Sequence, residues 1–261
     1  MSVTGAQLLV AFAAPEMVGD PGARAAALAV LDDGQRARMA RYVFERDRDL
    51  YLTMHSLERR LLSAVAGAAM VGDGVGDGVG DGVDPAHWQF AAGAYGRPDV
   101  VSPALAEQLN VNGSHTLGMT MCGVARGAVI GVDVEQLRNE VPLDVSDRFF
   151  APAEQAAIRA APPAEQPVRF FTSWTLKESY MKARGLGMSL PLDQFSIELA
   201  PGEAPRLHVT PAWDDGVAWC FEVLRPTPHH IAAVCHNAAG AVTVLPDAWA
   251  ILNATRARPI L

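Results

Sequence analysis

Two carboxylates stand one residue apart in the stretch GVDVE (131–135), inside an otherwise apolar run. In a β-strand, residues two apart point to the same face, so Asp133 and Glu135 would project together while Val132 and Val134 project to the other side. Two adjacent carboxylates repel each other, and their burial is costly unless a cation or hydrogen-bond donors compensate. Mg²⁺ is one natural compensator, but the motif taken alone favours the simpler interpretation of a solvated strand face.

A second group of ionisable residues lies in WTLKESYMKARGLG (174–187). Glu178 and Lys182 are four residues apart and would share one helix face. As an isolated surface ion pair they would contribute only about 0.3–0.5 kcal/mol. A carboxylate with Lys177 and Lys182 beside it also suits a metal ligand, or a base, placed among cations that neutralise a diphosphate.

Two shorter stretches carry polar groups that suit a phosphorylated ligand. Ser114 and His115, in NVNGSHTLG (110–118), are expected at a strand–turn junction, where a hydroxyl and an imidazole can face a phosphate. A lone histidine is more often structural or merely exposed. The turn YGRP (95–98) carries one arginine and by itself indicates little.

The order of expected elements predicts an α+β fold made of two α/β halves of similar design, residues 1–127 and 128–261. Hydrophobic periodicity predicts a long helix within 46–69 and a second one over 167–185. The runs at 117–125 and 128–135 are interpreted as neighbouring strands joined by a short turn at Arg126–Gly127. The tandem VGDGVGDGVGDGVDP (71–85) predicts a flexible loop within 71–84, because calcium-binding repeats need many longer units stacked together.

Composition excludes several classes of function. The net charge of −8 argues against a general nucleic-acid binder. No apolar run approaches the roughly 20 residues that cross a bilayer, so no membrane association is expected. The early run LLVAFAA (8–14) lacks a basic leader, and three widely spaced cysteines predict neither a disulfide framework nor a zinc site. A cytoplasmic location is therefore expected.

Taken together, the segments IGVDVE, RFFAPAE and FFTSWTLKESYMKARGLGMSLPLDQFSI resemble the signature run of the phosphopantetheinyl transferases, of the large surfactin-synthetase (Sfp-like) type. That family pairs G-(I/V)-D-(I/V)-E with W-x-x-K-E-x-x-x-K about forty residues further on, and both motifs stand here unbroken. The YGRP turn and the Ser-His pair also match in order and spacing. The resemblance covers roughly residues 30–235.

The resemblance implies an enzyme that moves the phosphopantetheine arm of coenzyme A onto a serine of an apo acyl, peptidyl or aryl carrier protein, releasing adenosine 3′,5′-bisphosphate. It implies a pseudo-twofold pair of α/β halves, with coenzyme A and Mg²⁺ (or Mn²⁺ in its place) in the cleft between them. Because that cleft lies within one chain, a monomer is expected. Docking of the carrier protein is expected at a small, largely apolar patch, around Phe149–Phe150 or the loop after Gly185.

The resemblance also implies roles for individual residues. Asp133, Glu135 and Glu178 would hold the metal ion, with Glu178 also the best candidate base, directly or through a metal-bound water, for the incoming serine hydroxyl. Lys177 and Lys182 would neutralise the diphosphate and the charge that develops on the leaving group. The residues expected to contact the rest of coenzyme A are Ser114 and His115 at the phosphates, Arg97 and Pro98 at the adenine, and Arg38 and Arg41 at the 3′-phosphate. His55 is the nearest match to a further basic residue of the long helix.

Two other functions use the same residues. A metal-dependent phosphohydrolase acting on a nucleotide diphosphate such as coenzyme A would leave the Ser-His pair and the arginines less well used. A catalytically silent coenzyme A-binding scaffold would not need intact Asp133, Glu135, Glu178 and Lys182. The transferase is therefore the leading hypothesis.

Overall fold

The computed structural model describes residues 6–68, 83–93, 98–105, 107–140 and 143–245. Most of the Gly-Asp repeat (71–84) and Arg97 lie outside these residues, so the predictions made for them stay predictions. The chain forms a mixed α+β structure, which confirms the predicted class.

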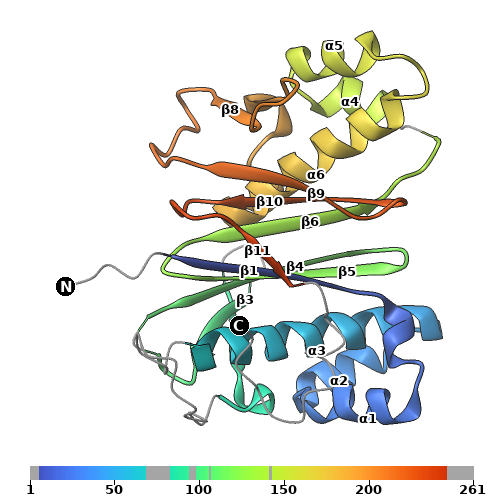
Figure 1. Ribbon diagram of the computed structural model, residues 1–261, viewed down its shortest axis with the longest axis vertical. Coiled ribbons are helices and arrows are strands. Elements are labelled where there is room, and N and C mark those ends of the chain that lie inside the picture. The colour runs from blue at the N-terminus through green and yellow to red at the C-terminus, as the bar shows by residue number, and fades with distance from the viewer. Residues whose placement is uncertain (1–5, 69–82, 94–97, 106, 141–142, 246–261) are drawn as a thin grey trace.

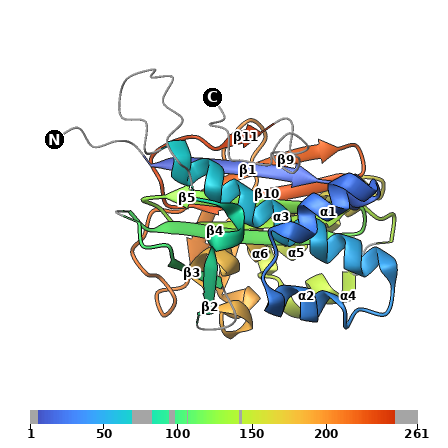
Figure 2. The ribbon, with the colours of Figure 1, turned by 90° about the horizontal axis from the view of Figure 1, so that it is seen from below.

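A four-stranded sheet forms the N-terminal layer. Its strands stand in the order β11 (Thr243–Leu245), β1 (Gln7–Ala13), β5 (Met119–Arg126) and β4 (Leu109–Thr116). Neighbours are antiparallel except β11, which is parallel to β1. The long helix α3 (Glu45–Ala68) covers the outer face, with α1 (Pro21–Ala29) and α2 (Asp33–Met39) beyond it (Figure 1). Seen from below, α3 lies across the strands of this sheet (Figure 2).

The predicted apolar stripe of α3 is confirmed by its packing. Leu57, Leu61 and Val65 are fully buried against Val111 of β4 and Val124 of β5. This spacing of three or four residues places one helix face on the sheet, and burial of that face is the main source of stability for a helix in water.

A three-stranded sheet forms the second layer, in the order β6 (Ile130–Gln136), β10 (His230–His236) and β9 (Cys220–Thr227). Helix α6 (Gln166–Arg184) covers its outer face (Figure 1). Outside α6 lie α4 (Leu143–Phe149), α5 (Pro152–Ala160) and the pair β7 (Phe195–Glu198) and β8 (Arg206–Val209). The pair β2 (Gln89–Ala92) and β3 (Pro98–Ser102) extends from the N-terminal layer. Short 3₁₀ turns occupy Pro15–Val18, Pro85–His87, Gly187–Ser189 and Leu192–Gln194.

The two sheets pack face to face, so the molecule is layered helix–sheet–sheet–helix (Figure 1). Val10 of β1 and Met121 of β5 contact the same buried cluster as Val132 and Val134 of β6. The alternation predicted for GVDVE is therefore confirmed, with the two valines in the core between the sheets. Asp133 and Glu135 face the opposite way, toward the side on which α6 packs.

The prediction that the strands at 117–125 and 128–135 are neighbours in one sheet is wrong. β5 pairs with β1 and β4, whereas β6 pairs with β10. The turn at Gly127, with φ +65°, takes the chain from one layer to the other. Two apolar runs joined by a short turn have the same sequence pattern whether the strands pair in one sheet or lie in two facing sheets, because each strand is buried in either case. The return of β11 to the N-terminal sheet was also not predicted. The twofold relation between the two halves, and the division between them at residue 127, stay predictions.

Gly131 sets the distance between β6 and α6. A Cβ at this position would lie 2.1 Å from the carbonyl oxygen of Ser179 and 2.4 Å from the backbone nitrogen of Ala183. These are backbone atoms of α6 and cannot move aside as a side chain can. The helix therefore lies directly on the strand, and only glycine leaves room for it.

We expect Gly131→Ala to lower the free energy of unfolding by about 3 kcal/mol or more, because the strand and helix must move apart. Gly240→Ala is the matched control, since its Cβ would lie 3.4 Å from the nearest atom, an ordinary contact; its effect should stay within about 0.5 kcal/mol. Urea denaturation followed by circular dichroism measures both. Equal effects of the two substitutions would contradict this explanation of the glycine.

Candidate active site

Asp133 is the centre of a polar cluster built by three elements. The residue is only 5% exposed. Oδ1 accepts hydrogen bonds from Nζ of Lys182 on α6 at 2.6 Å and from Oγ of Ser114 on β4 at 2.8 Å. Lys182 also donates to Oγ of Ser114 at 3.1 Å. The structure thus brings together three residues that the sequence predicted, which lie up to 68 positions apart.

The side chains of alternate residues of β4 form hydrogen bonds with β6 and hold the two strands together. Oδ1 of Asn112 accepts from the backbone nitrogen of Val132 at 2.9 Å. Oγ1 of Thr116 accepts from the backbone nitrogen of Gln136 at 3.3 Å and donates to Oε2 of Glu135 at 3.4 Å. Sequence reasoning missed Asn112 and Thr116, although the pattern N-x-S-x-T places both on the same strand face as Ser114.

Asp133 acts on the other two carboxylates of the predicted metal site. Burial raises the pKa of Glu178, and the charge of Asp133 raises it further, while Lys182 opposes both effects. Burial likewise raises the pKa of Glu135, with Asp133 again the next cause. Lys182, with Arg138 and the Thr116 hydroxyl beside Glu135, therefore compensates the site only in part, and a further cation would relieve the remaining repulsion.

Oδ2 of Asp133 identifies where such a cation could bind. It is buried and has no hydrogen-bond partner among the described residues. Within the described part of the chain, no three acidic, histidine or cysteine side chains are gathered so as to hold a metal ion by themselves. Mg²⁺, however, commonly binds one or two carboxylates together with water and substrate phosphates. The all-oxygen donor set and the unpartnered Oδ2 fit that chemistry.

Two cavities with shared walls form a cleft beside this cluster. The first, about 350 Å³, is lined by Lys182, Pro98 and His115 together with Met54 and His55 of α3. The second, about 280 Å³, shares Met54, His55 and His115 and continues to Arg38, Tyr42 and Tyr51. The cleft thus runs from the N-terminal helices to the C-terminal end of α6, and four predicted ligand-binding residues line it: Arg38, Pro98, His115 and Lys182.

Histidines occupy the middle of the cleft. His55 contacts Oε2 of Glu58 through Nδ1 at 2.9 Å, and its ring lies 4.2 Å from that of Tyr51. His115 is exposed at the rim, yet desolvation by the surrounding chain lowers its pKa, and the charge of Lys182 lowers it further. A neutral His115 can still donate one hydrogen bond to a phosphate oxygen.

Lys177 lies elsewhere, which contradicts its predicted role at the diphosphate. It is fully buried, and its Nζ donates to Oε2 of Glu154 at 2.6 Å and to the carbonyl oxygen of Phe195 at 2.7 Å. Consecutive helix residues point about 100° apart, so Lys177 cannot share the face of Glu178. Arg41 is exposed and lines neither cavity of the cleft, so its contact with a phosphate stays a prediction.

Comparison with known proteins gives the same family as the motifs. Residues 129–235 match the model of the 4′-phosphopantetheinyl transferase superfamily. The chain is 31% identical over 187 residues to the 4′-phosphopantetheinyl transferase HetI of Nostoc sp., covering 71% of this chain and 72% of that protein. The chain belongs to the 4′-phosphopantetheinyl transferase family.

Two Bacillus subtilis members of the family show the same likeness over shorter spans. A 4′-phosphopantetheinyl transferase is 36% identical over 139 residues, 53% of this chain and 58% of that protein. The 4′-phosphopantetheinyl transferase ffp is 35% identical over 162 residues, 58% of this chain and 70% of that protein.

No helix among the described residues is long and apolar enough to cross a membrane.

We expect Lys177→Met to destabilise the fold by about 3–5 kcal/mol, because it leaves the Glu154 carboxylate buried without its counter-charge. The double substitution Lys177→Met with Glu154→Gln removes both charges and should recover most of this loss. Thermal and urea unfolding of the two proteins measure the difference. A double variant no more stable than the single one would contradict a paired structural role.

We expect Glu178→Gln to stabilise the free protein by about 0.5–2 kcal/mol at neutral pH, because it removes a carboxylate that burial and Asp133 disfavour. A raised pKa in the folded state means that stability falls as the pH rises through that pKa. The gain should therefore vanish below the ordinary carboxyl pKa of 4.5. Glu198→Gln, an exposed carboxylate on β7, is the control and should change little. A destabilised Glu178→Gln protein would contradict the assigned electrostatics.

Proposed function

We propose that the protein transfers the phosphopantetheine arm of coenzyme A to a serine of an apo carrier protein, as a holo-carrier protein synthase. Family membership supports this, and the observation that carries it is the Asp133–Lys182–Ser114 cluster at one end of a cleft whose other end carries Arg38. Cations at both ends suit a nucleotide that carries a diphosphate and a separate 3′-phosphate.

Asp133, Glu135 and Glu178 would hold Mg²⁺, or Mn²⁺ in its place. When bound, the ion neutralises charge on the diphosphate. Oδ2 of Asp133 is the favoured first ligand, because it alone of this residue's oxygens is buried without a partner. Thr116 and Arg138 contact Oε2 of Glu135 and would orient its carboxylate.

Glu178 would act as the general base. Its raised pKa makes it a better proton acceptor than an ordinary carboxylate. The serine Oγ of the carrier attacks the phosphorus that bears the pantetheine arm, and Glu178 takes the serine proton. The bond from that phosphorus to the oxygen of the 5′-phosphate breaks, and adenosine 3′,5′-bisphosphate leaves with the electron pair. Lys182 neutralises the charge that develops on this leaving group.

The nucleotide would occupy the rest of the cleft. Arg38 and, from outside the cavity walls, Arg41 would bind the 3′-phosphate, and Pro98 with Arg97 would border the adenine. His115 would contact a phosphate as a donor, while Ser114 also fixes Oδ1 of Asp133. The imidazole of His55, which lines both cavities, faces the same ligand.

The carrier protein would dock beside Lys182, on exposed apolar side chains. Phe149 is 40% exposed, whereas Phe150 is 1% exposed and belongs to the core, so only the first fits this role. Met188, 76% exposed, lies in the short helix that follows Gly185 and is the alternative docking position. Because one chain supplies the whole cleft, we propose that the enzyme acts as a monomer. We also propose a cytoplasmic location, which the widely spaced cysteines suit. No observation favours hydrolysis of coenzyme A over transfer.

The test is incubation with coenzyme A, Mg²⁺ and an apo carrier protein, followed by mass spectrometry of the carrier. We expect a phosphopantetheine adduct on the carrier serine, and a loss of rate of at least about 10²-fold for Asp133→Ala and for Glu178→Ala. Asp147→Asn, on the surface of α4, is the matched control and should keep full activity. No adduct on acyl, peptidyl and aryl carriers under conditions where coenzyme A binds would sink the transferase proposal.

A further inference from the structure

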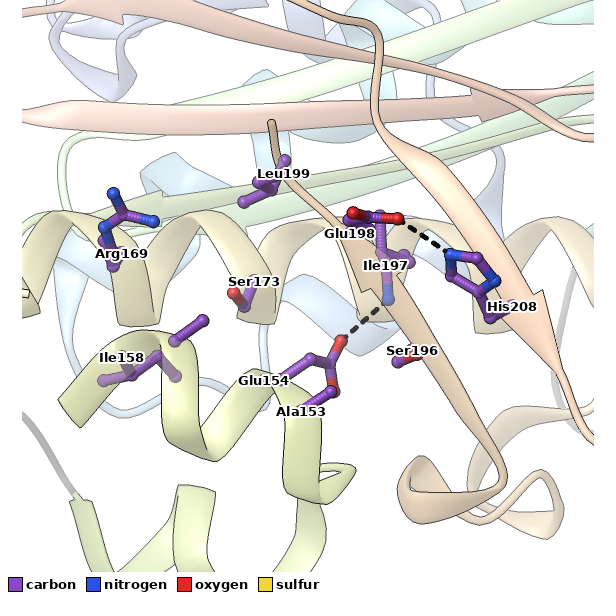
Figure 3. Close-up of a pocket in the computed structure, with 11 residues that line it drawn as sticks. Ala153, Glu154, Ile158, Arg169, Ser173, Ser196, Ile197, Glu198, Leu199 and His208 are labelled. Atoms are coloured by element: carbon purple, nitrogen blue, oxygen red, sulfur yellow. Dashed lines mark hydrogen bonds and ion pairs between the residues drawn. The ribbon is translucent and has the colours of Figure 1, made fainter. Parts of the chain in front are cut away.

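A separate cavity lies between α5, α6 and the β7–β8 pair, where no function has been assigned (Figure 3). Its volume is about 390 Å³, and it shares no lining residue with the two cavities of the cleft. Pockets for small organic ligands typically span about 300–1,000 Å³. The cavity therefore has room for a compact ligand.

Ser173 differs from the other hydroxyl residues of α6. Thr172, Thr175 and Ser179 donate to carbonyl oxygens of the helix itself, at 2.6, 2.9 and 2.8 Å. Ser173 is only 5% exposed and lines the cavity, yet no hydrogen bond joins its Oγ to any described residue (Figure 3). A helical serine without the usual bond to its own helix keeps both a donor and acceptors for a ligand.

Arg169 lies one helical turn before Ser173 and lines the same cavity (Figure 3). Its side chain is half-buried, and no acidic group of the described chain lies within ion-pair distance of it. The acidic residues of the cavity wall are already engaged. Glu154 accepts from Lys177, from the Ile197 backbone nitrogen at 3.0 Å and from the Ala151 backbone nitrogen at 3.2 Å.

The other walls are largely apolar. Ile158 of α5 and Ile197 of β7 are 1% and 3% exposed, and Leu199 closes one side (Figure 3). Glu198 stands at the margin, where it pairs with His208 at 3.1 Å. The cavity thus combines one cation without a partner and one free hydroxyl with an aliphatic surface.

We propose that this cavity binds a small monoanionic ligand with an apolar body, an aliphatic or aromatic carboxylate. The guanidinium of Arg169 presents two parallel N–H groups, which match the two oxygens of a carboxylate, and Ser173 donates a further hydrogen bond. The apolar body lies against Ile158, Ile197 and Leu199. A dianionic phosphate fits less well, because Glu154 and Glu198 lie in the same wall.

The test is isothermal titration of the full chain with hexanoate as the probe, at neutral pH. We expect saturable binding with a dissociation constant of about 1 mM or tighter. Arg169→Gln should weaken binding at least about tenfold, and Ser173→Ala about two- to tenfold, as the loss of one hydrogen bond. Arg159→Gln, an exposed arginine on α5 outside the cavity, should bind like the original protein.

A second ligand keeps the test decisive even where a variant folds poorly. 1-Hexanol has the same apolar body without the charge, and it should bind the original protein at least about tenfold more weakly than hexanoate. Equal binding of 1-hexanol and hexanoate would overturn the proposal, as would unchanged hexanoate binding in a folded Arg169→Gln protein. So would the lack of saturable binding by the original protein up to about 20 mM hexanoate.

Discussion

The candidate active site depends on the close contact between β6 and α6 at Gly131. Because no side chain separates them, the helix backbone lies directly on the strand. Asp133, two residues further along the strand, then comes within 2.6 Å of Lys182. A wider spacing would leave the acidic side chain buried without a counter-charge. The motif GVDVE thus supplies both the glycine that lets α6 approach β6 and the aspartate that Lys182 neutralises.

Charge compensation explains how the two lysines of α6 differ. Lys177 is paired with Glu154 inside the protein, where it joins α5, α6 and β7. Lys182 is 28% exposed in its side chain, lines the cleft, and donates to Asp133 and Ser114 beside it. The first pair is complete without a ligand. The second leaves Oδ2 of Asp133 without a partner in the described part of the chain and two neighbouring carboxylates with raised pKa values, so it favours the binding of a cation.

Much of the site follows from the periodicity of the sequence. The alternation of GVDVE separates Asp133 from the valines of the core, and the spacing of four residues places Glu178 and Lys182 together. The same helical geometry places Lys177 on another face, because consecutive helix residues point about 100° apart and adjacency to Glu178 in the sequence does not bring the two side chains together. The crossing of the chain between layers at Gly127 and the pairing of β11 with β1 depend on contacts between distant residues, which no local pattern specifies. Asn112 and Thr116 were missed because their partners are mostly backbone groups of another strand.

A crystal structure of the protein with coenzyme A and Mn²⁺ would test whether Asp133 and Lys182 form the metal and diphosphate site, because anomalous scattering locates the ion. We expect one Mn²⁺ at ordinary coordination distance from Oδ2 of Asp133, about 2.1 Å, with the diphosphate beside Lys182 and the 3′-phosphate toward Arg38. An ion bound away from Asp133, or a diphosphate that does not approach Lys182, would contradict it.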